Sequence, residues 1–427
     1  MVEDFCMDPR IDATEEPLTG PRAPVDCGSL LPLSTRLGPT LLFLQHAHPI
    51  FAMKFPALLL LAVILAVTPL HAGKTYVGLA GAAGFNDHVH SGLVAIHLNG
   101  TTTLSARIRW QGFEDSTAGA FGEDGVFRAT VRKPGGSFAV EIRQPAMGTV
   151  SGSIIDRDIR ATFVARPTGV PEIPEPAGRY NGVWQDNGAL GFLIHSTFSA
   201  GVSEDRVRII GKLNDGTPFS TGTWLVPGSE FELWTGVRVP AIQVPIYFGV
   251  YGFAKRGSVW GEMKIFNINP DFTPGFGRRF TQEINGSAQW FRPAQPAGPA
   301  PNMAGQSELS LYGNIYEITP ESPWMIVPEV LEAPPQARLT LISLDGLFGA
   351  TIPLMVHPGN TLSVDGSNPL RVQLFTVPEI GIFAGSFVHP PSGRRIHFSG
   401  LARPGGDGIG SYLNGRSLGS AIILGED

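Results

Sequence analysis

Cysteine is almost absent from this chain of 427 residues, and both copies, Cys6 and Cys27, lie near its start. The sequence beyond residue 72 has no thiol, which excludes disulfides, thiol catalysis and cysteine-ligated zinc there. Charged residues make up only 16% of the chain, and acidic and basic residues nearly balance after residue 72. A near-neutral chain lacks the basic excess that binds phosphate backbones, so nucleic acid is not an expected partner.

Long apolar runs are missing too, with one exception that begins at Met53. The stretch "MKFPALLLLAVILAVTPLHAGKTYVGLAG" has a basic residue at Lys54, an apolar run over 57–67 and a small residue at Ala72. This order is typical of a secretory signal peptide. We therefore predict a hydrophobic signal helix over 53–72, with cleavage near Ala72 and export to the cell envelope or the extracellular space.

The same stretch has an alternative interpretation as an uncleaved membrane anchor. Nineteen residues without a full charge separate Lys54 from Lys74, close to the roughly 20 that a spanning helix needs. Pro56 and Pro69 shorten the continuous apolar run, which favours the cleaved signal. Contact with a membrane is expected only if the signal stays uncleaved.

Residues 1–52 combine proline, glycine and acidic residues without a sustained period, which is typical of disorder. Our preferred explanation is that Met53 is the true start and that the upstream stretch is a mis-called extension. The alternative is a cytoplasmic tail on a signal-anchored protein.

Outside the signal-like stretch, long helical patterns are nearly absent. The chain has 53 glycines and 37 prolines beside abundant valine, isoleucine and phenylalanine, which indicates short strands joined by tight turns. We predict an all-β fold, and two proline-rich stretches divide it. The expected divisions are β block 1 at 73–167, a linker at 168–177, β block 2 at 178–293, a second linker at 294–305 and β block 3 at 306–427.

A short pattern recurs along the blocks, with two glycines four residues apart and apolar residues at fixed places between and after them. It occurs as GTVSGSI (148–154), GRYNGVW (178–184), GSVWGEM (257–263) and GIFAGSF (381–387). Residues two apart on a strand share a face, so Gly182 lies between Tyr180 and Trp184. A glycine there leaves room for a neighbouring ring and lets the sheet bend. We expect curled antiparallel sheets that form barrel- or sandwich-like blocks.

These strings resemble those of a group of uncharacterised exported bacterial β-repeat proteins of the verrucomicrobial type, which carry G-x-Y-x-G and G-x-F-x-G-x-F repeats. The resemblance covers most of 73–424. It is carried by GRYNGVW (178–184), GKLNDGTPFS (211–220), GSAQWFRP (286–293) and the glycine- and aromatic-rich string over 381–424. The resemblance implies export and an all-β build. It implies no activity and supplies no catalytic residues.

Candidate catalytic motifs find little support. GRSLG (415–419) matches the nucleophile elbow of hydrolases, but that motif needs a following helix and a later histidine, and none follows. We predict a turn there and another at DRD (156–158). Paired acids at 114–115, 123–124 and 204–205 are interpreted as solvated turns rather than a glycosidase pair. We expect no catalysis and no cofactor.

Two histidines, His88 and His90, share one side of an extended NDHVH stretch (86–90) and are weak candidates for a metal site. A metal site needs a third or fourth ligand, and Asp87 and His97 are near in sequence only. The favoured interpretation is a polar loop, with no metal.

Strand alternation sorts the tryptophans into two groups. Trp110, Trp184 and Trp290 are in register with apolar neighbours and are predicted core residues. Trp234 and Trp260 are out of register and are candidates for an exposed platform that stacks on sugar rings or contacts a protein. The alternative is that a neighbouring block covers them.

We therefore expect an exported protein with a structural or adhesive role, whose partners are a polysaccharide or a surface protein. Two alternatives stay open. A carbohydrate-binding module would use Trp234 and Trp260, and a secreted hydrolase would need a pocket with converging carboxylates, or with histidine and serine.

Overall fold

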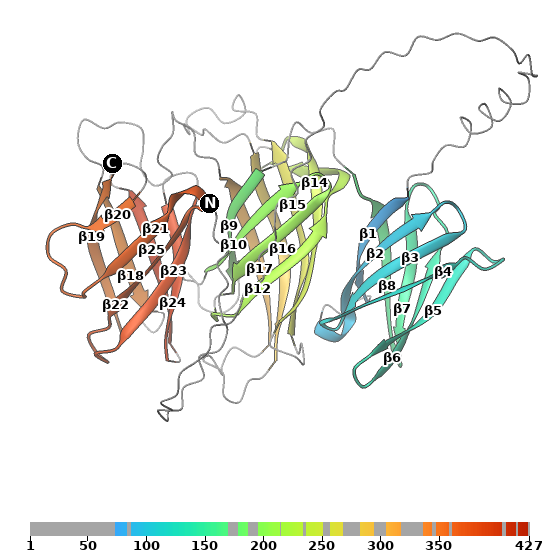
Figure 1. Ribbon diagram of the computed structural model, residues 1–427, viewed down its shortest axis with the longest axis horizontal. Helices are drawn as coiled ribbons and strands as arrows, with labels where there is room; N and C mark the ends of the chain where they lie inside the picture. The colour runs from blue at the N-terminus through green and yellow to red at the C-terminus, as the bar shows by residue number, and fades with distance from the viewer. Residues whose placement is uncertain are drawn as a thin grey trace, which may run out of the picture. The chain divides into compact units, whose positions relative to one another are not determined.

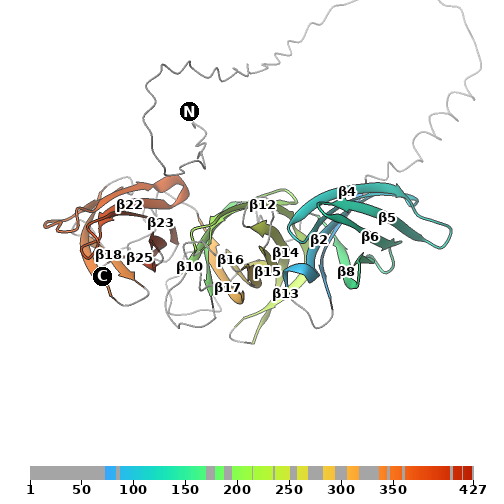
Figure 2. The same ribbon diagram turned by 90° about the horizontal axis from the view of Figure 1, so that it is seen from below.

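The computed structural model describes the residues in fourteen ranges: 73–82, 87–169, 178–186, 195–213, 215–233, 236–250, 257–267, 282–293, 305–316, 336–343, 347–357, 361–403, 407–415 and 417–425. The predicted signal peptide, its cleavage site and residues 1–52 lie outside these ranges, as does Trp234. The described part is all-β, as predicted, and consists of three curled antiparallel sheets (Figures 1 and 2).

Sheet 1 has eight strands in the order β4-β3-β2-β1-β8-β7-β6-β5. Its first and last strands are hydrogen-bonded neighbours, and its two edges are the consecutive strands β4 and β5. A short 3-10 helix, η1 (His88–His90), precedes β2. The strands are β1 (Lys74–Gly81), β2 (Ser91–Asn99), β3 (Thr103–Trp110), β4 (Phe113–Ala120), β5 (Val126–Lys133), β6 (Gly136–Arg143), β7 (Val150–Asp156) and β8 (Ile159–Pro167).

Sheet 2 has nine strands in the order β12-β11-β10-β9-β17-β16-β15-β14-β13. Again its first and last strands, β9 and β17, are paired, and its edges are consecutive in sequence. The strands are β9 (Gly178–Asp186), β10 (His195–Ser203), β11 (Arg206–Lys212), β12 (Pro218–Trp224), β13 (Val226–Glu232), β14 (Arg238–Val250), β15 (Gly257–Asn267), β16 (Gln282–Arg292) and β17 (Gly305–Ile315).

The last strand of sheet 2 lies where the sequence placed the start of the third block. Strand β17 pairs with both β16 and β9, so the proline-rich stretch at 294–305 falls between two strands of one sheet rather than between blocks. Proline-rich segments interrupt a hydrogen-bond ladder equally well at a domain boundary and between neighbouring strands. The composition of that stretch could not distinguish the two.

Sheet 3 has eight strands in the order β20-β19-β18-β25-β24-β23-β22-β21. The strands that come first and last in the sequence, β18 and β25, are paired. A 3-10 helix, η4 (Pro378–Ile380), precedes β22. The strands are β18 (Gln336–Ser343), β19 (Gly349–His357), β20 (Thr361–Val364), β21 (Gln373–Val377), β22 (Ile382–Val388), β23 (Arg395–Arg403), β24 (Asp407–Asn414) and β25 (Ser417–Gly425). None of the helices in the described ranges has the length and apolar character that a membrane crossing requires.

Each sheet curls around a core of its own side chains. Trp110 in sheet 1 and Trp184 and Trp290 in sheet 2 are fully buried, as predicted from strand alternation. In the repeat GSVWGEM (257–263), Gly261 faces Ala288. In the other three repeats a glycine faces an aromatic ring directly across the ladder, as expected. The pairs include Gly152 with Phe163 in sheet 1, Gly182 with Phe198 in sheet 2 and Gly385 with Phe398 in sheet 3.

The motifs interpreted as turns are hairpin turns. GRSLG joins β24 to β25, where Asn414 pairs with Ser417 and Gly415 has a positive φ of 61°. DRD joins β7 to β8, where Asp156 pairs with Ile159. Of the acidic pairs, Glu114 and Asp115 lie within strand β4 instead of a turn. Strand β4 is an exposed edge strand, whose polar sequence does not show the apolar alternation that marks a strand.

Candidate functional site

Apolar side chains join the outer faces of sheets 1 and 2. Val77, Leu93 and Ala95 on strands β1 and β2 form one buried cluster with sheet 2 side chains. The sheet 2 members are Trp224, Val226 and Tyr247. Since these residues face away from both sheet cores, their burial requires the contact between the two sheets.

Hydrogen bonds cross the same contact and fix its geometry. The Nη1 atom of Arg109 donates to Thr221 Oγ1 at 3.1 Å and to the carbonyl of Gly222 at 2.8 Å. The backbone N–H of Gly112 donates to the hydroxyl of Tyr247 at 2.6 Å. Burial raises the pKa of that Tyr247 hydroxyl, which stays protonated.

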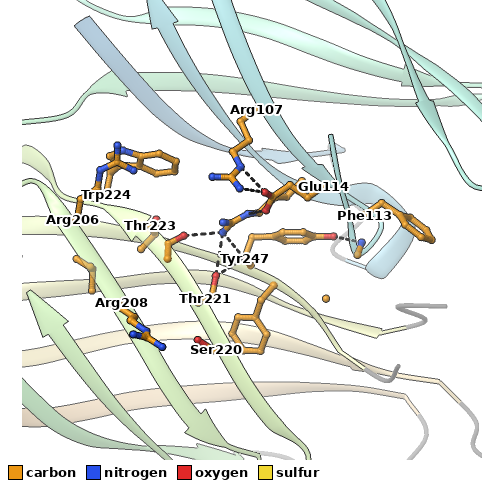
Figure 3. Close-up of a pocket in the computed structure, with 16 residues that line it drawn as sticks. Arg107, Phe113, Glu114, Arg206, Arg208, Ser220, Thr221, Thr223, Trp224 and Tyr247 are labelled. Atoms are coloured by element: carbon orange, nitrogen blue, oxygen red, sulfur yellow. Dashed lines mark hydrogen bonds and ion pairs between the residues drawn. The ribbon is translucent and has the colours of Figure 1, made fainter. Parts of the chain in front are cut away.

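A groove of about 560 Å³ opens beside this contact, between the β3–β4 hairpin of sheet 1 and strands β11, β12 and β14 of sheet 2 (Figure 3). Four arginines and one carboxylate line it, with serine and threonine hydroxyls and Trp224. We call it the arginine groove and define it by Arg107, Arg109, Glu114, Arg206, Arg208 and Gly222. Its positive charge contrasts with the net charge of −6 carried by the whole chain.

The carboxylate of Glu114 is shared by the two arginines of strand β3. Arg107 binds its Oε1 atom, and the Nε atom of Arg109 donates to Oε2 at 2.6 Å. Glu114 therefore neutralises only part of the charge on this side and holds both guanidinium groups at the rim of the groove. Figure 3 shows Arg107 and Glu114 in this contact.

The two arginines of strand β11 are more available. The side chain of Arg206 is 60% exposed, and its Nε atom lies 3.5 Å from Asp205 Oδ1. Its guanidinium carbon lies 4.5 Å from the ring centroid of Trp224. Arg208 is exposed and has no ion-pair partner among the described residues. Its guanidinium can donate two parallel hydrogen bonds to a carboxylate, sulfate or phosphate group.

A glycine keeps the floor of the groove open. Gly222 on strand β12 lies directly opposite Arg208, and Trp224 lies opposite Arg206. A methyl group built on Gly222 would meet only the carbonyl of Val207, at 3.9 Å. The space above Gly222 can therefore hold an anionic group within reach of several arginines.

Two short sequence signals could have identified this groove. In "RIR" (107–109) and "RVR" (206–208), arginines two apart lie on one strand face. Neither signal alone indicates a groove, because two strands about a hundred residues apart must meet before the charges gather.

The candidate platform residue Trp260 lies on the outer face of sheet 2, as alternation predicted. It is half-buried instead of exposed, because sheet 1 lies against it. It packs on the cluster of Val77, Leu93 and Tyr247 that joins the sheets. The other candidate, Trp234, lies outside the described residues. Trp260 is therefore part of the contact between sheets 1 and 2.

The candidate metal ligands have other partners. His88 Nδ1 lies 2.9 Å from Ser258 Oγ of sheet 2, and His90 Nδ1 lies 2.6 Å from Asp87 Oδ1. Asp87 also caps η1 through backbone N–H groups. The two histidines therefore stabilise the start of strand β2 and its contact with sheet 2. The described residues include no cluster of three metal-ligating side chains.

Comparison with known proteins assigns no family. No protein-family model matches the chain, and no curated protein matches it. Among solved structures it is similar to a candidate outer membrane protein from Bacteroides fragilis, with 11% identity over 58% of this chain and 97% of that chain and a TM-score of 0.20. A variant of transferrin binding protein B from Haemophilus parasuis shares 9% identity over 84% and 77% of the two chains, with a TM-score of 0.21.

A third similar structure is kievitone hydratase from Nectria haematococca, with 12% identity over 58% of this chain and 90% of that chain and a TM-score of 0.16. TM-scores this low give no grounds for transferring the function of any of the three proteins to this chain.

Proposed function

We propose that the protein is exported and acts as a non-catalytic adhesive protein that binds anionic polymers in the arginine groove. The observation that carries the proposal is the gathering of Arg107, Arg109, Arg206 and Arg208 around the open floor at Gly222, with Glu114 as the only acidic side chain in the lining. Such an arrangement attracts carboxylates and sulfates through charge-assisted hydrogen bonds.

The groove is suited to binding rather than to hydrolysis. A glycosidase needs two carboxyl groups at a defined separation, one of which must be able to give up a proton. The lining supplies one carboxyl group, that of Glu114, and both of its oxygens are engaged by guanidinium groups. The lining has no histidine to act as a base for its serine and threonine hydroxyls.

Export is the first testable part of this proposal. The signal-like stretch at 53–72 predicts that a bacterial host releases a product that begins at Gly73. N-terminal sequencing of the exported protein checks this. A product that keeps residues 53–72 would support the membrane-anchor alternative, and retention in the cytoplasm would exclude export.

Ligand binding is tested by removing the two arginines of strand β11. We expect Arg206→Gln/Arg208→Gln to weaken binding to an immobilised polygalacturonate about 10-fold or more, since two charge-assisted contacts are lost. Binding of the unchanged protein should fall as salt rises from about 50 to about 300 mM, because the ligand contacts are exposed to screening. Surface plasmon resonance measures both effects.

The matched control is Arg132→Gln/Arg143→Gln, which removes the same charge from exposed positions on strands β5 and β6 of sheet 1. It should retain binding, and neutral dextran should bind none of the proteins. If the control variant loses as much affinity as the groove variant, the interaction depends on net charge alone and the arginine groove is not the site.

A further inference from the structure

A second groove lies on the outer face of sheet 3, where strands β21, β22 and β23 run side by side and Lys212 of sheet 2 reaches toward them. It has a volume of about 520 Å³. The side chain of Phe375 lines it and is 57% exposed, which makes it the one aromatic residue among the exposed large hydrophobic residues of the described ranges. We call it the Phe375 groove and define it by Lys212, Gln373, Phe375, Ser386, His397 and Ser399.

Sheet register places small side chains beside the ring. Phe375 pairs with Ala384, and Ala384 pairs in turn with Ser399. Neither of these neighbours is large enough to cover a phenyl ring. An uncovered ring beside small residues gives a flat apolar surface on which the C–H face of a pyranose can lie.

The next row of the sheet supplies hydrogen-bonding groups. Gln373 pairs with Ser386, which pairs with His397. The Nη1 atom of Arg395 donates to Gln373 Oε1 at 2.9 Å and to Ser386 Oγ at 2.8 Å. Because these contacts occupy the oxygen of the Gln373 amide, its NH₂ group is directed to donate elsewhere.

Two further polar groups in the groove are available to a ligand. Among the described residues, the side chains of His397 and Ser399 have no hydrogen-bond partner. An amide donor, an imidazole and a hydroxyl around one aromatic ring can satisfy the hydroxyl groups of a sugar, which both donate and accept.

Charge narrows the class of sugar. Lys212 is the one ammonium group in the lining, and no carboxylate lines the groove. Burial lowers the pKa of Lys212, and the charge of Asp215 opposes that effect only in part. A partly desolvated ammonium group gains from an anionic partner, and a single carboxylate matches its single charge.

We propose that the Phe375 groove binds a hexuronate residue of an acidic polysaccharide, with the pyranose ring on Phe375 and the carboxylate at Lys212. The proposal rests on the proposed function in that both grooves take an acidic polymer. It adds a second site, which would let one chain hold two segments of the polymer and raise the effective affinity without new contacts at the arginine groove.

The test uses trigalacturonate and its methyl ester as a matched pair of probes, titrated into the exported chain by calorimetry. All measurements are made in the Arg206→Gln/Arg208→Gln background, which reduces the contribution of the arginine groove. We expect Phe375→Ala to weaken trigalacturonate binding about 5- to 10-fold. Phe375→Tyr keeps the ring and should retain binding.

Lys212→Gln should weaken binding of the acid about 10-fold and leave binding of the methyl ester unchanged. Leu347→Ala removes an exposed apolar side chain outside the groove and is the control for nonspecific surface effects. Thermal unfolding of each variant checks that the fold persists.

Equal affinity for trigalacturonate and its ester would overturn the assignment to a uronate, and retained binding in Phe375→Ala would overturn the site itself. These outcomes are distinguishable from failure of the proposed function. That failure would appear as unchanged polygalacturonate binding in Arg206→Gln/Arg208→Gln when the Phe375 groove is intact.

Discussion

Replacing Gly182 with alanine should destabilise sheet 2 by about 3 kcal/mol, and replacement with valine should destabilise it further. A Cβ atom on Gly182 would lie 2.6 Å from Cζ of Phe198 and 2.8 Å from the backbone oxygen of Tyr312. Phe198 is fully buried in the core of sheet 2, so its ring has no free space to move into.

Closure of the sheet adds to this effect. Gly182 lies opposite Gly313 on strand β17, where the first and last strands of sheet 2 meet. A Cβ atom on Gly313 would lie 2.7 Å from the Cα atom of Gly182, so the two backbones approach closely there. A side chain at Gly182 would therefore disturb both the aromatic core and the joint that closes the sheet.

Gly201 on strand β10 provides the matched control. It lies in the same sheet, and a Cβ atom built on it meets no other atom within 4 Å. Gly201→Ala should leave stability unchanged or raise it by about 0.5 kcal/mol, because alanine restricts the unfolded chain. Urea unfolding followed by tryptophan fluorescence measures both variants.

A double-mutant cycle tests the physical cause. Phe198→Leu shortens the side chain that faces Gly182. If crowding of that ring is the cause, the combined variant should be less destabilised than the sum of the two single changes. Additive effects, or equal effects of Gly182→Ala and Gly201→Ala, would show that the ring does not need the space above Gly182.

Replacing Asp156 with alanine should cost sheet 1 about 3 kcal/mol, because the change leaves a buried ammonium group without its anion. Asp156 is 3% exposed and forms an ion pair with Lys133, whose side chain is 13% exposed. Gln111 bridges the pair, since its Nε2 atom donates to Asp156 Oδ2 at 2.9 Å and its Oε1 atom accepts from Lys133 Nζ at 2.7 Å.

This ion pair also predicts the pH dependence of stability. Burial by itself raises the pKa of the Asp156 carboxyl, but the hydrogen bond and charge of Lys133 outweigh burial and bring that pKa below its ordinary value. A lowered folded pKa means that the stabilising contribution is complete above the unfolded pKa of about 3.9 and is lost as pH falls through the folded pKa.

The difference in unfolding free energy between the unchanged protein and Asp156→Asn should therefore be constant from about pH 7 to pH 5 and shrink below about pH 4. Asp158→Ala, at an exposed position of the same hairpin, should change stability by less than about 0.5 kcal/mol. A difference that grows on acidification would contradict the assigned sign of the pKa shift.

Local pattern was enough to predict several features of the fold. The alternation of glycines with apolar residues predicted that Gly182 faces an aromatic ring. The same alternation predicted that Trp184 and Trp290 lie in the core. The hairpin turn at Asn414 and Ser417 followed from the lack of a histidine and a helix after GRSLG. Each of these inferences depends on neighbours within one strand or one hairpin.

The features that the sequence analysis missed depend on distant pairings. Strand β17 pairs with the preceding strand β16, but the pairing that closes sheet 2 is with β9, more than a hundred residues earlier in the chain. Trp260 has the outward orientation that alternation predicted, but the sheet that covers it comes from another part of the chain. The arginine groove likewise needs strands β3 and β11 to come together.

By itself, the sequence determined that this protein is built from short strands that curl around glycine-spaced aromatic cores, since strand alternation and turn chemistry are local properties. Only the tertiary structure decided which strands close each sheet, which outer faces are buried and where cationic side chains gather. Those outcomes depend on contacts between segments that are distant in sequence, whose packing a local period of two residues does not encode.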